Sequence, residues 1–277
     1  MKNIIILALL LLSINAFSQT DELFNIIRIN GKIYNISTGE DLNQGNTLKP
    51  QDKLNFESDQ SSGIVISNLR KKYTLRMPYD LGVGDDVFAI AELSLNPILS
   101  RGQLSTRGLM GPNGVKDLKT YLSEENFNII GDEIDIHLDK NLYPLNDDKF
   151  IVFYYKINDI QVSKKVGFDK QYLNINKEKL LESNGEILNS DTLSYVSIYQ
   201  YEKSTEETNL ITQVNISFIN KDNLRKEFLA IVPILKKQNY ENEEIRQYLF
   251  EYFFDVYGNV DETQLNNFIL EIINSQE

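Results

Sequence analysis

The spacing of apolar residues is the strongest constraint on the fold, and it changes once along the chain. In residues 25–77 and 128–219, apolar and polar side chains alternate in short runs that Asn, Asp and Gly separate. A two-residue period of this kind is typical of strands that bury one face. From residue 221 onward, apolar residues recur every three or four positions, as in amphipathic helices. We therefore predict a mainly β protein of the α+β class that ends in helices.

Residues 19–80 are predicted to form a small β module. Its expected strands cover residues 25–29, 32–36, 53–56, 63–67 and 73–77. Asn30-Gly31 favours a hairpin turn between the first two strands, and the polar residues 68–72 are predicted to join the last two. Five short strands within about 55 residues predict a strongly bent sheet or a small barrel.

Four stretches of this module resemble the FecR-like pattern. They are Asn30-Gly31-Lys32-Ile33, residues 42–48, residues 52–56 and residues 63–67. FecR-like modules are periplasmic β domains of regulatory proteins, so the resemblance implies that fold and compartment for residues 19–80. Such regulators also carry a transmembrane helix and a cytoplasmic sigma-binding part, which this sequence does not show, so the resemblance does not extend to their signalling role. The whole chain is similar to secreted Bacteroidetes proteins that begin with such a module.

Residues 81–120 are predicted to be an irregular linker with a short helix at 115–122, because Pro and Gly interrupt them repeatedly. In residues 121–220 the alternation returns, and strands are expected at residues 133–138, 150–157, 161–166, 193–201 and 210–219. The near-continuous apolar run at 150–157 is predicted to be a central strand. Strands joined by polar turns in this way predict an antiparallel, β-sandwich-like second domain.

Residues 221–277 are predicted to form a C-terminal segment of two or three helices. Asp222 and Asp261 precede helical runs and are the predicted N-caps, and Gly258 is a predicted helix stop. Pro233 is expected to kink or shorten the first helix, because proline interrupts the hydrogen-bond ladder. The last two helices are amphipathic, so they must bury an apolar face, either on each other and the sheet or on a partner.

Residues 1–18 have the three-part pattern of a secretory signal peptide. Lys2 supplies the positive charge, residues 4–12 are apolar, and Ala16 and Ser18 place small side chains at positions −3 and −1 of a cut after Ser18. The apolar run is too short for a membrane anchor, which needs roughly 20 residues. We therefore predict a periplasmic or secreted protein, cleaved after about Ser18, with no membrane span in the mature chain.

Charge and cysteine content exclude several functional classes. The chain has no cysteine, which excludes thiolate catalysis, cysteine-bound zinc and haem attachment. Its formal net charge of −12 argues against binding to nucleic acids or acidic membrane surfaces. The basic cluster Arg70-Lys71-Lys72, with Arg76 nearby, falls at a predicted hairpin turn, where we expect it to be solvated.

His137, the single histidine, is the first candidate site residue. In a strand it shares one face with Glu133 and Asp135, and a carboxylate beside a histidine can form an oriented base or a metal site. However, Ile134 and Ile136 alternate with these polar residues, so we predict that the polar face is the solvent-exposed one. One histidine also excludes a multi-histidine zinc site within the chain.

Other motifs are assigned to loops and turns. Gly82-Val83-Gly84 lacks the strand–turn–helix context of a dinucleotide site, and Ser105 in Ser105-Thr106-Arg107-Gly108 lacks the elbow motif of a hydrolase nucleophile. Clustered acidic residues could supply oxygens to calcium, but none has the spacing of a calcium loop, so turn chemistry is favoured. These clusters are Glu40-Asp41, Asp85-Asp86 and Asp147-Asp148. We assign no catalytic, cofactor-binding or metal-binding residue.

Tyrosines on the predicted strands are a weaker signal of a binding face. They are Tyr154, Tyr155, Tyr195, Tyr199 and Tyr201. Exposed, they would suit a sugar- or protein-binding face, but burial or half-burial in the sandwich is favoured. The sequence thus predicts a non-enzymatic binding protein of the cell envelope, whose partner is another envelope or periplasmic protein. The alternative is a secreted glycan-binding protein or hydrolase whose site is assembled from loops such as residues 99–114.

Overall fold

The computed structural model describes residues 22–79, 88–100, 110–111, 113–122, 126–157, 160–183, 185–188 and 190–276. The predicted signal peptide and the segments around Gly82 and Ser105 lie outside these residues. The predicted fold class is confirmed, because the protein is mainly β with several antiparallel sheets and C-terminal helices. The chain forms two compact units, Met1–Ile98 and Leu99–Glu277. Among the described helices, none is long and apolar enough to cross a membrane.

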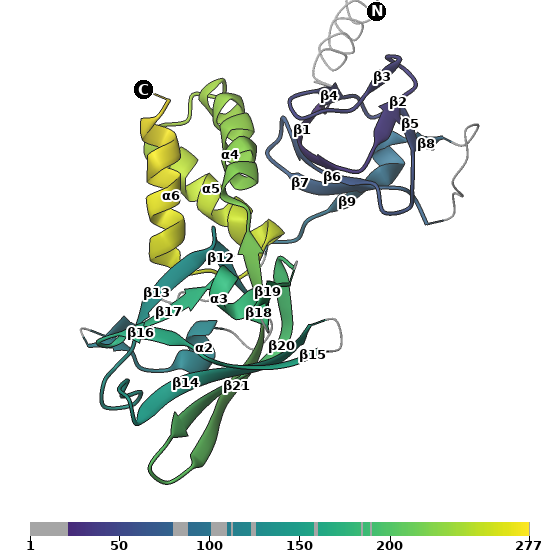
Figure 1. Ribbon diagram of the computed structural model, residues 1–277. Coiled ribbons are helices and arrows are strands. Elements are labelled where there is room, and N and C mark those ends of the chain that lie inside the picture. The colour runs from purple at the N-terminus through teal and green to yellow at the C-terminus, as the bar shows by residue number, and fades with distance from the viewer. Residues whose placement is uncertain are drawn as a thin grey trace, which may run out of the picture. The chain divides into compact units, whose positions relative to one another are not determined.

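The first unit consists of two small sheets of short strands (Figure 1). One has the order β4-β1-β6-β7-β9, with β1 (Phe24–Asn30), β4 (Thr47–Leu48), β6 (Ser62–Ser67), β7 (Lys72–Arg76) and β9 (Leu95–Pro97). The other has the order β3-β2-β5-β8, with β2 (Ile33–Asn35), β3 (Glu40–Asp41), β5 (Lys53–Phe56) and β8 (Ala89–Ile90). The 3₁₀ turn η1 (Ala91–Ser94) follows β8. The described strands form no closed barrel.

The hairpin predicted at Asn30-Gly31 is wrong. Strand β1 pairs with β4 and β6, whereas β2 pairs with β3 and β5, so the turn carries the chain from one sheet to the other. Gly31 has φ +72°, and a Cβ there would lie 2.8 Å from Ser61 Oγ. Glycine is therefore required at this corner.

The predicted pairing of the last two strands is confirmed, since β6 and β7 form an antiparallel pair with Arg70 in the turn. Strand β8 pairs with β5, and β9 pairs with β7. Residues 88–98, which fall in the predicted linker, therefore belong to the first unit. Its core contains Phe24, Ile26, Ile33, Leu48, Leu54, Val65 and Leu75.

The second unit contains a large sheet with the order β12-β21-β20-β14-β15. Its strands are β12 (Asn126–Ile130), β14 (Lys149–Ile157), β15 (Ile160–Lys165), β20 (Thr192–Glu202) and β21 (Glu207–Ile219). A smaller sheet, β13-β17-β16, contains β13 (Glu133–His137), β16 (Gly167–Asp169) and β17 (Tyr172–Asn176). The short hairpins are β10 (Met110–Gly111) with β11 (Gly114–Val115), and β18 (Glu182–Ser183) with β19 (Glu186–Ile187). Strand β14 lies inside the large sheet, as predicted.

One hydrophobic core joins the two sheets and the short helices α2 (Leu118–Leu122) and α3 (Lys177–Leu181), which gives the predicted sandwich-like arrangement. Alternate residues of β14 enter it from the large sheet, and Ile134 and Ile136 enter it from β13. One pairing departs from the antiparallel pattern, because β12 runs parallel to β21.

Three helices end the chain: α4 (Lys221–Lys236), α5 (Asn242–Val256) and α6 (Glu262–Asn274). Asp261 caps α6 as predicted, accepting the Gln264 N–H at 2.6 Å. The predicted Asp222 cap is wrong, because the side chain of Asn220 accepts the Asn223 N–H at 2.9 Å instead, and Asp222 lies in the first turn. Helix α4 continues through Pro233 and ends three residues later.

The helices pack on each other and on the edge of the large sheet, beside β12 (Figure 1). Within the bundle, the buried Glu227 accepts hydrogen bonds from Tyr252 and Tyr257, each at 2.7 Å. At the sheet, Asn128 donates its side-chain amide to the carbonyl oxygens of Tyr257 and Asn259, each at 2.9 Å. The amphipathic faces are thus covered within the second unit.

Candidate functional site

The large sheet carries aromatic side chains on the face opposite its core. Along β14, Ile151 and Phe153 are buried, so Phe150, Val152 and Tyr154 point to the other face. Register aligns this face of β14 with β20, and the directly opposed pairs are Val152 with Tyr199 and Phe150 with Tyr201. Side chains opposed in this way lie close enough to interact. The strand register therefore collects the rings into one patch.

This patch is hollowed into an open concavity of about 570 Å³, which we call the aromatic groove. Its lining residues are Phe150, Val152, Tyr154, Ser163, Lys165, Tyr199, Tyr201 and Thr208. They come from four adjacent strands, β15, β14, β20 and β21. A groove built across paired strands holds its side chains in fixed relative positions. Such a groove favours binding, because few of its side chains lose conformational freedom when a ligand binds.

The groove combines apolar rings with one cation. The rings of Phe150 and Tyr201 lie 5.2 Å apart, and Lys165 Nζ lies 4.2 Å from the centre of the Phe150 ring and 5.3 Å from that of Phe168. A cation over a ring face is held by the ring quadrupole. Hydroxyl groups of the lining tyrosines, Ser163 and Thr208 add hydrogen-bonding capacity. The groove can therefore bind a ligand that has an apolar surface beside polar or anionic groups.

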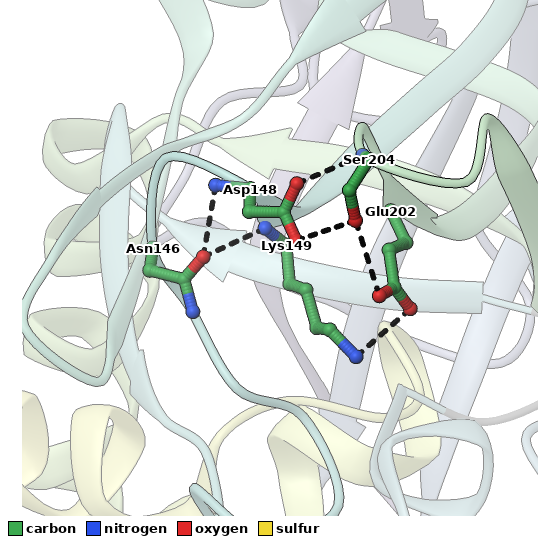
Figure 2. Close-up of polar contacts among 5 residues, drawn as sticks. All are labelled: Asn146, Asp148, Lys149, Glu202 and Ser204. Atoms are coloured by element: carbon green, nitrogen blue, oxygen red, sulfur yellow. Dashed lines mark hydrogen bonds and ion pairs between the residues drawn. The ribbon is translucent and has the colours of Figure 1, made fainter.

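A polar cluster fixes the end of the groove next to Phe150 and Tyr201 (Figure 2). Asp148 accepts hydrogen bonds from the main-chain N–H of Ser204 at 2.8 Å and from its hydroxyl at 3.0 Å. Lys149 forms an ion pair with Glu202 at 2.8 Å, and this contact raises the pKa of Lys149. Asn146 Oδ1 accepts the N–H groups of Asp148 and Lys149. These contacts tie the start of β14 to the β20–β21 turn.

The two predicted acidic clusters that the structure describes belong to different units of the chain. Asp148 serves turn chemistry, as predicted. Asp41 lies on β3 in the other unit, 3.5 Å from Lys32 Nζ, and Asp85-Asp86 lies outside the described residues. Within the part of the chain that the structure describes, no group of three or more metal-ligating side chains gathers.

The tyrosines singled out from the sequence divide between the two faces of the sheet. Tyr154, Tyr199 and Tyr201 line the aromatic groove. Tyr155 is buried in the core and donates its hydroxyl hydrogen to the Leu180 carbonyl oxygen. Tyr195 is 80 % exposed at a bulge in β20, with φ +54°. The favoured prediction of burial or half-burial fits Tyr155, Tyr199, Tyr201 and the 39 % exposed Tyr154, and it is wrong for Tyr195.

Sequence reasoning missed Phe150 and Lys165 as groove residues. Phe150 could have been found, because it alternates with residues expected in the core. Lys165 could not, because its contact with Phe150 depends on the β14–β15 register, which pairs Val152 with Lys165.

The polar face that contains His137 is solvent-facing, as predicted, and each of its residues has a partner across the strand. Glu133 and Asp135 accept hydrogen bonds from Asn176 and Asn174, which lie directly opposite on β17. The His137 ring stacks on Tyr172 at 4.7 Å. The two carboxylates and the imidazole therefore form a ladder of cross-strand pairs.

Comparison of the sequence with known proteins finds no matching family model and no matching curated protein. Functional interpretation therefore rests on the geometry of the aromatic groove and on the sequence patterns.

Proposed function

We propose that the protein is an exported, non-enzymatic binding protein of the cell envelope and that the aromatic groove is its ligand-binding surface. The observation that carries this proposal is the gathering of four aromatic rings on the solvent side of one sheet. Phenylalanine and tyrosine bury much apolar area on binding, and the tyrosine hydroxyl still forms a hydrogen bond. Such residues dominate the energetics of protein–protein contacts.

The compartment is part of the same proposal. The charged, apolar and small-residue pattern of residues 1–18 supports export. The FecR-like resemblance of the N-terminal module supports a role in the envelope. We propose that this first unit assists placement there and that the second unit carries the ligand.

A glycan is the second candidate ligand. The groove places the hydroxyl groups of Ser163 and Thr208 beside the rings of Tyr154 and Tyr201, their respective partners across the strands. A sugar presents an apolar face of C–H groups and an edge of hydroxyls, so this mixture of rings and hydroxyls also suits it. A protein ligand stands first, because the groove in addition carries the Lys165 cation over Phe150.

The test compares the wild-type protein with the double variant Tyr199→Ala/Tyr201→Ala. The matched control is Tyr172→Ala, which removes a half-exposed tyrosine from the smaller sheet. Each tagged protein is incubated with an envelope extract and with immobilised polysaccharides, and circular dichroism checks that each is folded. We expect the wild type and the control to retain the same protein ligand. The groove variant should retain at least tenfold less of it.

Two results would count against the proposal. If the folded groove variant retains every ligand of the wild type, the groove is not the binding surface. If polysaccharide alone is retained, and only by proteins with an intact groove, the glycan candidate replaces the protein candidate.

A further inference from the structure

Among the strands that the structure describes, β15 is at the edge of the large sheet, and it borders the aromatic groove. Its main chain pairs with β14, and Val166 N–H donates to the Ile151 carbonyl oxygen at 2.9 Å. In an antiparallel pair, hydrogen-bonded positions alternate with positions whose N–H and C=O groups point away from the neighbouring strand. Because Val166 bonds to β14, the main-chain groups of Lys165, Ser163 and Gln161 point to the open side.

The same residues direct their side chains away from the core. Val162 is buried, whereas Gln161, Ser163 and Lys165 are exposed, and the last two line the groove. Side chains of adjacent strands that are opposite in register share one face of a sheet. A strand added outside β15 would therefore place every second side chain at the groove.

Charge restricts which strand could be added. Lys164 and Lys165 end β15, and Lys165 is the charged residue among those that line the groove. Among the described residues, these two lysines form no ion pair, in contrast to Lys149, which pairs with Glu202. Lysines on an edge strand disfavour pairing with most other strands. An added strand that carries carboxylates would neutralise the positive charges of Lys164 and Lys165.

From these features we infer that the groove binds an extended acidic peptide segment of a partner protein, which adds to β15 as an antiparallel strand. This inference rests on the proposed function and names its ligand class. Main-chain hydrogen bonds to Gln161, Ser163 and Lys165 hold the segment, and its alternate side chains enter the groove or face Lys165. In strand addition the main chain provides affinity and the side-chain sites provide specificity.

The probe is a blocked ten-residue peptide in which Glu and Val alternate. Titration calorimetry with the full chain measures its affinity. A second reporter is the variant Tyr201→Trp, which places a single tryptophan in the groove because the natural chain has none. We expect saturable binding with a Kd below about 1 mM, together with a change in tryptophan emission. The comparison peptides carry Lys in place of Glu, or N-methyl groups on alternate amides.

Ser163→Pro is the decisive variant. It removes one outward N–H and puts a ring on the open edge, where an edge strand tolerates proline. We expect about tenfold weaker binding of the Glu peptide to Ser163→Pro and a smaller loss for Ser163→Ala, which keeps the N–H and removes only the groove hydroxyl. The control Tyr172→Ala, on the smaller sheet, should bind within about twofold of the wild type. Lys165→Glu should reverse the preference so that the Lys peptide binds more tightly than the Glu peptide.

The inference is overturned if the Glu peptide does not bind at 1 mM, if the N-methylated peptide binds equally well, or if Ser163→Pro leaves the affinity unchanged. These failures differ from failure of the proposed function. If the peptide fails but Tyr199→Ala/Tyr201→Ala still abolishes capture of an envelope ligand, the groove remains the binding surface and strand addition is wrong.

Discussion

Two buried tyrosines make the stability of the second unit sensitive to alkaline pH. Tyr121 is fully buried and donates its hydroxyl hydrogen to Asp261, and Tyr155 is 2 % exposed. Burial, and then the negative charge of Asp261, raises the pKa of Tyr121 far above its ordinary value of 10.0. Burial alone raises the pKa of Tyr155. Both phenols therefore keep their protons in the folded protein at pH values where the unfolded chain loses them.

The sign and size of the effect follow from linkage. Since the folded pKa values are raised, the stabilisation is complete below the unfolded value of about 10 and is lost as the pH rises through the folded values. Between these limits each tyrosine lowers the free energy of unfolding by about 1.4 kcal/mol per pH unit. Because both tyrosines ionise in the unfolded chain, the free energy of unfolding at pH 11 should be about 3 kcal/mol lower than at pH 8.

Urea unfolding followed by circular dichroism at pH 8 and pH 11 tests this reasoning. At pH 8, Tyr121→Phe should lower the free energy of unfolding by about 2 kcal/mol, because a buried hydrogen bond to a carboxylate is lost. At pH 11 the difference from wild type should shrink by about 1.4 kcal/mol, since the variant has one fewer tyrosine to ionise on unfolding. Tyr155→Phe should show the same reduction in pH dependence.

The matched control is Phe127→Leu. The Phe127 ring lies 5.6 Å from the Tyr121 ring and carries no group that titrates. Its free energy of unfolding should fall at both pH values by the same amount, about 1–2 kcal/mol. If the Tyr121→Phe and Phe127→Leu profiles both run parallel to the wild type, protonation of the buried phenol does not contribute and the reasoning is refuted.

Three further changes probe other parts of the molecule. Glu227→Ala leaves two tyrosine hydroxyls of the helix bundle without their acceptor, and urea unfolding should show a loss of about 2–4 kcal/mol; an unchanged midpoint would contradict the network. Gly63→Ala places a Cβ 2.9 Å from a main-chain carbonyl oxygen of β1 and should lower the free energy of unfolding by about 1–3 kcal/mol. In the same assay the control Gly167→Ala, whose Cβ would have no neighbour nearer than 3.7 Å, should lower it by less than half as much. Asp148→Ala should accelerate amide hydrogen exchange at Ser204 with a stability change below about 1.5 kcal/mol, and unchanged exchange would show that the turn is held by other contacts.

Much of the strand pattern could be predicted because it depends on neighbouring residues. In β14, Tyr155 is in phase with the buried Ile151 and Phe153, so its burial and the exposure of Tyr154 follow from the two-residue period. The same period correctly placed His137 on the solvent side of β13. The Asp261 cap is also a local signal, since its acceptor and the Gln264 donor lie three residues apart.

The remaining features depend on contacts between distant residues. Asn30-Gly31 permits a positive φ, which suits a hairpin and a corner equally well, and the pairing of β1 and β2 with distant strands of two different sheets decides between them. The aromatic groove requires the pairing of β14 with β15 and β20. A single sequence does not give that register, so the proximity of Lys165 to Phe150 could not be predicted.

The bonds from β12 to the end of the chain have a consequence for the order of folding. Asn128 reaches Tyr257 and Asn259 across 129 and 131 residues, and Gln264 returns to Ile130 across 134. Contacts this distant close late and slow the folding of the part that needs them. During synthesis, the second unit therefore completes its fold only after residues 257–264 have left the ribosome. The first unit has its own core and can fold while they are still confined.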